Sequence, residues 1–171
     1  MYSFTAIFDA CVLYPAPLRD LLMYLTGSDA FQARWTEKIH EEWMRSLLKN
    51  RPDLSRENLE RTRRLMDAYV DDCLVTGYES LIDTLHLPDP NDRHVLAAAI
   101  KAKASFIVTF NIRDFPPTVL DAHQIQTITP DEFVMRLLDE DYTVTGHKLV
   151  ILSAPTPFRK RGTAIPEKSN L

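Results

Sequence analysis

The chain has 171 residues, which is enough for one compact domain and too few for two independent cores. Its 45% hydrophobic and 26% charged residues exclude wholesale disorder. The sequence contains no apolar stretch of membrane-spanning length, no basic N-terminal signal and only two cysteines. We therefore expect a cytoplasmic protein without a membrane association, a disulfide framework or a sulfur-bound metal.

Charge is distributed unevenly along the chain. The net charge of −4 argues against indiscriminate coating of nucleic acid. Residues 1–146 carry a net charge of −8, residues 147–171 carry +4, and the stretch 33–64 has nine basic side chains against six acidic ones. Four arginines of that stretch are candidate contacts for phosphates: Arg45, Arg61, Arg63 and Arg64. A solvated helical face with mixed charges is the alternative interpretation.

The first half of the chain predicts one strand followed by three helices. The β-branched and aromatic run SFTAIF predicts a buried strand that ends at Asp9. Leucines at helical spacing predict a helix over 17–25, with Gly27 as its stop. Longer helical patterns cover 30–49 and 55–72. They are separated by a breaker at 50–53, and Ser55 is placed as a cap, so a helical hairpin is expected.

The second half alternates strands with helices. We expect short strands at 73–76, 105–110 and 124–129, a helix over 89–103 and another helix starting near Pro130. This alternation predicts an α/β fold whose short, mostly parallel sheet is flanked by helices. In such folds the ligand site lies beyond the carboxyl ends of the strands. Residues 1–140 are expected to form the domain and residues 141–171 a basic, proline-containing tail.

Four carboxylates fall at predicted strand ends or at helix positions that can face them. They are Asp9, Glu42, Asp92 and Asp114. Asp9 follows the first strand, although an aspartate also suits a turn there. The helical phase places Glu42 with Trp35 and Ile39 on the apolar side, where a carboxylate is costly without a partner, whereas Glu41 points elsewhere. A shift of the helix boundary would exchange these two glutamates.

Asp92 and Asp114 have different local contexts. The run Asp89-Pro90-Asn91-Asp92 is a strong helix start, so capping alone explains an acid at position 92. The same geometry also directs Asp92 toward the strand ends if that helix end faces them. Asp114 leaves the 105–110 strand through a loop in which Thr109 and Asn111 offer further oxygens as supporting groups.

A cluster of this kind requires either a bound cation or protonation of some of its carboxylates. Two carboxylates about 4 Å apart repel each other by about 4 kcal/mol at an effective dielectric constant of 20. Oxygen ligands without paired Cys or His favour Mg²⁺ or Mn²⁺ over zinc, and the five histidines show no i, i+4 pairing. Such ions bind phosphate oxygens and activate water, so hydrolysis of a phosphate ester is the expected chemistry.

Several segments resemble the PIN-domain ribonucleases, particularly the VapC-like toxins of bacterial toxin–antitoxin pairs. The resemblance covers about residues 4–135. It rests on IFDACVLYPAPLRDLL, TEKIHEEWMRSLL, LPDPNDRHVLAAAIKAKASFIVTFNIRDFP and ITPDEFVMRLL. It implies a three-layer α/β fold, cleavage of RNA that depends on Mg²⁺ or Mn²⁺, formation of homo-oligomers and a cognate antitoxin protein as partner.

The resemblance also implies which residues act. The acidic positions of the family fall on Asp9, Glu42, Asp92 and Asp114, which are implied to be both catalytic and metal-binding. One departure concerns position 111, where many relatives carry an aspartate and this chain has Asn111. Because an amide carries no charge, mechanisms with one metal and with two metals both remain open.

Two other functions compete with this interpretation. A catalytically silent PIN-like module that binds RNA or a protein partner would keep the fold while tolerating loss of the acids, and all four acids are present. A phosphohydrolase resembling the haloacid dehalogenase group would use Asp9 as a nucleophile. That group needs a second acid two residues later, where this chain has Cys11.

Overall fold

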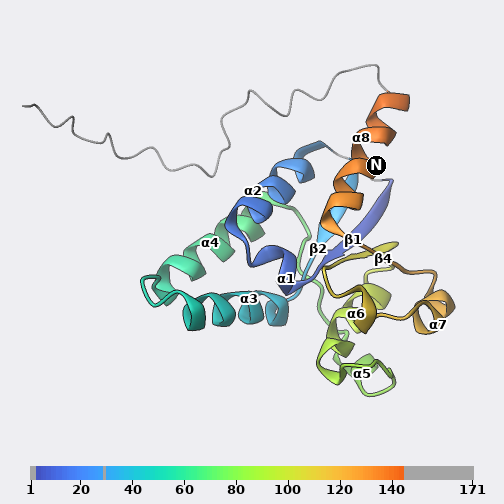
Figure 1. Cartoon of the computed structure of the whole chain (residues 1–171), viewed down its shortest axis with the longest axis horizontal. Coiled ribbons are helices and arrows are strands. Elements are labelled where there is room, and N and C mark those ends of the chain that lie inside the picture. Colours follow the sequence, from blue (N-terminus) through green and yellow to red (C-terminus); the bar gives the residue numbers. More distant parts are fainter. Residues whose placement is uncertain (1–2, 29, 145–171) are drawn as a thin grey trace, which may run out of the picture.

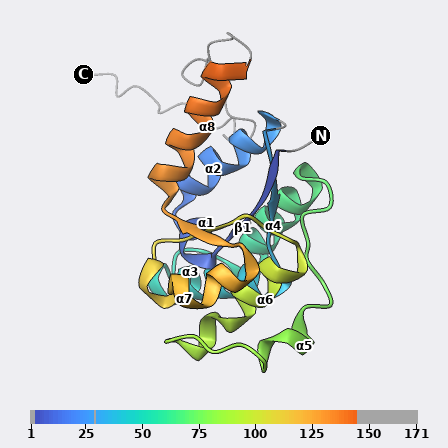
Figure 2. The same cartoon turned by 90° about the vertical axis from the view of Figure 1, so that its right-hand side faces the viewer.

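The computed structural model describes residues 3–28 and 30–144, with side chains described as far as residue 139. Most of the expected tail at 141–171 therefore lies outside the described residues. Figures 1 and 2 show the helices arranged around a small sheet, with α8 (Pro130–Val144) projecting away from the end that holds α6 (Arg93–Lys101) and α7 (Pro117–Leu120). No helix among the described residues is long and apolar enough to cross a membrane.

The sheet has four strands, all parallel. They are β1 (Phe4–Phe8), β2 (Phe31–Arg34), β3 (Phe106–Val108) and β4 (Gln126–Ile128), in the order β2-β1-β3-β4. Every residue of β3 is buried, as expected for a strand covered on both faces. The predicted α/β class with a short parallel sheet is confirmed.

Helices cover both faces of the central strands. Phe133 of α8 is fully buried and makes edge-to-face ring contacts with Phe4, Phe8 and Phe31, at centroid distances of 6.2, 5.9 and 4.9 Å. α6 packs against β1 and β3, and Figure 1 shows it on the opposite side of β1 from α8 and α2 (Ala16–Leu25). A threonine–glutamate capping box starts α8, because Thr129 and Glu132 hydrogen-bond each other's backbone N–H.

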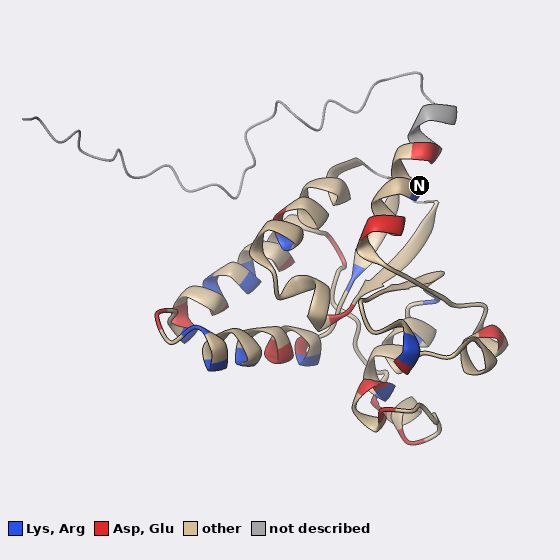
Figure 3. Cartoon of the chain, in the orientation of Figure 1, with Lys and Arg blue, Asp and Glu red and all other residues tan. Residues whose placement is uncertain are grey.

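The expected helical hairpin is formed by α3 (Glu37–Asn50) and α4 (Arg56–Tyr69). Ser55 caps α4 by accepting a hydrogen bond from the Asn58 N–H at 3.2 Å, as the sequence predicted. Lys and Arg alternate with Asp and Glu along both helices (Figure 3), and Arg56 bridges them by pairing with Glu41 at 2.5 Å. The two helices are thus held together by surface ion pairs as well as by apolar contacts.

A buried polar network joins this hairpin to the end of β2. Asp67 accepts hydrogen bonds from Trp35 Nε1 at 2.8 Å and lies 2.9 Å from His40 Nε2. Trp43 Nε1 donates to His40 Nδ1 at 3.0 Å, so the second ring nitrogen of His40 is an acceptor. Burial lowers the pKa of His40, and the hydrogen bond that His40 donates to Asp67 opposes that shift only in part. His40 is therefore a structural histidine.

The expected helix over 30–49 is wrong at its beginning. Residues 31–34 form β2, and the helix starts only at Glu37, after Thr36 caps it by accepting from the Ile39 N–H. Pairing with β1 decides the outcome, because Phe31, Gln32 and Ala33 are buried against the sheet. The expected strand at 73–76 is likewise reduced to a single parallel bridge between Trp35 and Leu74.

Short elements complete the described chain. A 3₁₀ turn at Pro90–Asp92 leads into α6, so the expected helix over 89–103 is confirmed with a tighter first turn. Two further one-turn helices are α1 (Ala10–Leu13) and α5 (Glu79–Ile82). Three more 3₁₀ turns occupy Thr26–Ser28, Ile112–Asp114 and Asp121–His123. The turn at Ile112–Asp114 follows β3 and therefore shapes the carboxyl edge of the sheet.

Candidate active site

Asp9 lies at the carboxyl end of β1 and is 4% exposed. Its backbone N–H donates to Val108 of β3 at 3.1 Å, which fixes it between the two central strands. One carboxylate oxygen accepts from the Ala10 N–H at 2.7 Å and so caps α1, and the other accepts from the Thr109 hydroxyl at 2.7 Å. The side chain is therefore held in one orientation by groups from both strand ends.

Cys11 adds a third contact to this arrangement. Its thiol donates to Asp9 Oδ2 at 3.2 Å and lies 3.3 Å from the Thr109 hydroxyl. The backbone N–H of Phe110 in turn donates to the sulfur at 3.3 Å. Burial, together with the charge of Asp9, raises the pKa of the Cys11 thiol to about 12. The thiol consequently keeps its proton and serves as a hydrogen-bond donor.

Glu42 on α3 meets His94 on α6. His94 Nε2 lies 2.9 Å from Glu42 Oε1, and the His94 side chain is 1% exposed. Neither ring nitrogen has a well-aligned hydrogen-bond partner among the described residues, so the contact is electrostatic rather than a directed hydrogen bond. Glu41 pairs instead with Arg56, whereas the charge of Glu42 acts on Asp92.

Asp92 experiences the charge of the whole cluster. Its pKa is raised from 3.8 to about 7, first by burial and then by the charges of Asp9, Asp89, Asp114 and Glu42. The Asp92 side chain makes no capping hydrogen bond to α6, whereas Asp89 accepts from the Asn91 N–H at 2.8 Å. The capping hydrogen bond is therefore made by Asp89, whereas Asp92 supports the start of α6 only through its charge.

Asp114 completes the cluster from the turn after β3. Its N–H donates to the Asn111 carbonyl at 3.0 Å, and its charge contributes to the raised pKa of Asp92. The Asn111 N–H donates to the Thr109 hydroxyl at 3.0 Å, so Thr109 links this turn to Asp9. Asp9, Glu42 and Asp114 thus each lie close enough to Asp92 for their charges to act on it.

The donor set fits a hard divalent cation in its chemistry. The four groups supply only carboxylate oxygens, and neighbouring negative charges add to the effect of burial in raising the pKa of Asp92. Within residues 3–28 and 30–139, no three His, Cys, Asp or Glu side chains converge closely enough to hold an ion between them. The carboxylates therefore form an open cluster rather than a closed ligand set.

The candidate phosphate-binding arginines lie on the helical hairpin. Arg45 is exposed on α3, and Arg61 and Arg64 are exposed on α4. Arg63 lies among acids, with an ion pair to Glu37 and its Nε 3.6 Å from Asp67 Oδ2. These contacts occupy Arg63 in the folded chain, while Arg61 and Arg64 form no ion pair within the described residues.

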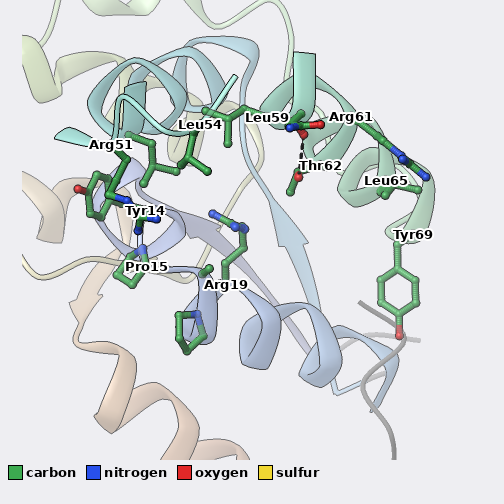
Figure 4. A pocket seen from close by; sticks show the side chains of 14 residues that line it. Tyr14, Pro15, Arg19, Arg51, Leu54, Leu59, Arg61, Thr62, Leu65 and Tyr69 are labelled. Atoms are coloured by element: carbon green, nitrogen blue, oxygen red, sulfur yellow. Dashed lines mark hydrogen bonds between the residues drawn. The ribbon is translucent and has the colours of Figure 1, made fainter. Parts of the chain in front are cut away.

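A cavity of about 900 Å³ lies away from the carboxylates, between the start of α2 and the hairpin (Figure 4). Tyr14, Leu54, Leu59 and Leu65 give it an apolar lining, and Arg19, Arg51 and Arg61 add positive charge. None of the four candidate acids borders it. The cavity is therefore separate from the proposed chemistry.

Comparison with known proteins identifies the family. A sequence model of the PIN domain matches residues 5–113, and the chain belongs to the PIN domain family. A protein of Mycobacterium tuberculosis named "Putative ribonuclease VapC50" is 43% identical over 63 residues, which are 37% of this chain and 37% of that protein. The chain thus matches little more than a third of the length of this curated relative. No solved structure matches the chain significantly.

Two residues at the carboxyl edge were not expected from the sequence. The sequence pattern assigned no role in the site to Cys11 or to His94. Their position two residues after Asp9 and Asp92, respectively, is the signal that could have drawn attention to them. Their partners come from other elements, so local pattern alone could not assign the contacts.

Proposed function

We propose that this protein is an endoribonuclease dependent on Mg²⁺ or Mn²⁺ that hydrolyses phosphodiester bonds of RNA. One observation carries the proposal: at the carboxyl edge of a parallel sheet, burial and the charges of Asp9, Asp89, Asp114 and Glu42 raise the pKa of Asp92 to about 7. Membership of the PIN domain family and the similarity to VapC50 support the ribonuclease class. The excess of negative charge is the property that a divalent cation would correct.

Asp9, Glu42, Asp92 and Asp114 are the residues that would hold the cation. When bound, the cation supplies Lewis-acid stabilisation of the phosphate charge and lowers the pKa of an attacking water. The carboxylates act in this scheme as ligands rather than as nucleophiles. Asn111 provides an amide oxygen beside them without a charge, so it supports the site more weakly than an aspartate would.

The surrounding residues orient these carboxylates. Thr109 and Cys11 hold Asp9 Oδ2 through hydrogen bonds of 2.7 and 3.2 Å. His94 holds Glu42 through its contact of 2.9 Å between α6 and α3. Such outer partners fix the direction of a ligand oxygen and strengthen its binding to a metal. The buried position of Thr109 and His94 makes this support rigid.

The partner, the location and the oligomeric state of the protein form the second part of the proposal. We propose further that the protein is a toxin that acts in the cytoplasm as a homo-oligomer and is controlled by a cognate antitoxin protein, as the resemblance of its motifs to VapC-like toxins implies. Co-purification with a small protein encoded beside this chain tests the partner. Light scattering of the purified protein at several concentrations tests the oligomeric state, and a monomer mass throughout would contradict that part of the proposal.

The enzymatic claim is tested by incubating purified protein with a mixed RNA pool and mapping the new ends. Cleavage is expected with Mg²⁺ or Mn²⁺ and is expected to disappear with excess chelator. The Asp9→Asn variant, which keeps the volume of the side chain, serves as the control for contaminating nucleases. RNA binding without any new ends in the presence of metal would instead identify a catalytically silent binding module.

A further inference from the structure

Phe110 is an exposed aromatic side chain at the edge of the carboxylate cluster. It is 54% exposed, whereas the other phenylalanines among the described residues are buried or half-buried. No aromatic ring contacts it within the described part of the chain. The residue thus leaves in water a large apolar surface that most phenylalanines bury.

The backbone of Phe110 is fixed relative to the carboxylates. Its N–H donates to the Cys11 sulfur at 3.3 Å, and the same sulfur contacts Asp9. Both neighbours of Phe110 in the chain are also held in place. The Thr109 hydroxyl donates to Asp9, and the Asn111 N–H donates to the Thr109 hydroxyl at 3.0 Å. The exposed ring is therefore presented from an anchored position rather than from a loose loop.

RNA that binds beside the carboxylates requires an attractive contact that does not involve its phosphate charge. The cluster of Asp9, Glu42, Asp92 and Asp114 repels the phosphates of RNA, and the chain as a whole carries a net charge of −4. Stacking of a base on an aromatic ring is independent of phosphate charge. Ile112, which is 36% exposed, and the exposed Arg113 continue the same segment with an apolar group and a cation.

We propose that Phe110 is the platform of a nucleobase-stacking subsite beside the carboxylates, where it holds an unpaired base next to the scissile bond. The inference rests on the proposed ribonuclease function and adds to it a residue that positions the substrate. An unpaired base exposes its faces for stacking, whereas bases within a duplex are covered by their neighbours. Phe110 contributes binding and placement of the base, and the carboxylates contribute the chemistry.

Tryptophan fluorescence offers a direct test of stacking. The chain has two tryptophans, Trp35 and Trp43, and both are at most 1% exposed. A Phe110→Trp substitution therefore adds one exposed indole at the subsite. The substitution is made in the full-length Asp9→Asn protein, so that RNA is not cut during the titration.

Three oligonucleotides of equal phosphate number distinguish stacking from charge. They are a single-stranded RNA, a duplex of two complementary strands half as long, and an abasic strand. We expect quenching of the new indole by the single strand, weaker quenching by the duplex and none by the abasic strand. Equal quenching by the single and abasic strands, or no quenching by an RNA that binds, would overturn the proposal.

Affinity and turnover provide the second readout. Phe110→Leu should weaken binding of single-stranded RNA and raise the KM for its cleavage by about 5- to 100-fold, and Phe110→Tyr should restore both. Met135→Ala removes a side chain of similar exposure, 56%, from α8 and should change neither.

Different experimental results would refute the stacking subsite and the ribonuclease function. If the wild-type protein cleaves RNA and Phe110→Leu has the same KM, the stacking subsite is refuted and the ribonuclease function stands; the ring then belongs to a contact with another protein. If the wild-type protein produces no metal-dependent ends from any RNA, the function itself is refuted, and the subsite with it.

Discussion

Replacing Asp92 with asparagine should stabilise the metal-free protein. The pKa of Asp92 is raised from 3.8 to about 7 by burial and by four neighbouring carboxylates, so its ionisation opposes folding. Because the folded pKa lies above the unfolded one, the penalty is absent below about pH 4, grows between pH 4 and pH 7 and is complete above pH 7. Asparagine has nearly the same volume and carries no charge.

The magnitude follows from the same shift. A rise of the pKa from 3.8 to about 7 corresponds to an upper limit of about 4 kcal/mol. Asp92 is only half-buried, and solvent screening reduces this to about 1–2 kcal/mol. The lost interaction with the N-terminus of α6 costs about 0.3–1 kcal/mol in the opposite direction. The net gain of about 1 kcal/mol should raise the melting temperature by about 2–4 °C.

Melting curves in chelator at pH 8 and at pH 4.5 measure this effect. The variant should melt later than the wild type at pH 8, and the two curves should approach each other at pH 4.5. Asp131, an acid in the first turn of α8, provides the matched control, because Asp131→Asn should melt slightly earlier. Added Mg²⁺ should stabilise the wild type more than Asp92→Asn. Earlier melting of Asp92→Asn at pH 8 would refute the reasoning.

Three further substitutions test separate parts of the structure. Thr109→Val removes the hydroxyl that donates to Asp9 while keeping the shape of the side chain. It should slow single-turnover cleavage at least tenfold and lower the free energy of unfolding by about 1–3 kcal/mol. An unchanged cleavage rate would show that Asp9 needs no such support. Arg61→Ala combined with Arg64→Ala should lower RNA affinity and flatten its salt dependence, whereas an unchanged slope in filter binding would leave these arginines as solvated surface. Phe133→Ala should lower the free energy of unfolding, measured by urea denaturation, by about 3–5 kcal/mol, because the ring is fully buried among three other rings. A decrease of less than 1 kcal/mol would contradict this packing.

The sequence predicts the parallel sheet and most of its helices because their signals are local. Alternating strand and helix patterns, the cap at Ser55 and the helix start at Asp89 depend on neighbouring residues, and the structure confirms them. The strand β2 was missed because its residues run directly into a helical pattern. Its alternating Phe31, Ala33 and Trp35 are a period-two signal, but only pairing with β1 makes it decisive.

In the candidate site, too, local sequence signals predict some features, and tertiary packing determines the others. The phase of α3 distinguishes Glu42 from Glu41 even though Trp35, which was counted on that helix, lies beyond the end of β2. The contact of His94 with Glu42 joins α6 to α3, and the thiol of Cys11 reaches Thr109 from 98 residues away in the chain. Such pairs depend on tertiary packing, which residue spacing does not encode locally.

Metal-dependent cleavage by matched wild-type and Asp9→Asn proteins tests the central claim most directly. Single-turnover cleavage of an RNA from the mapped pool is measured over a Mn²⁺ titration, with melting curves to show that both proteins are folded. The wild-type rate should rise with Mn²⁺ and saturate, and Asp9→Asn should remain at least a hundredfold slower at every concentration. Equal rates for the two folded proteins, or cleavage by the wild type that persists in excess chelator, would contradict the assignment of the carboxylate cluster as a metal-dependent ribonuclease site.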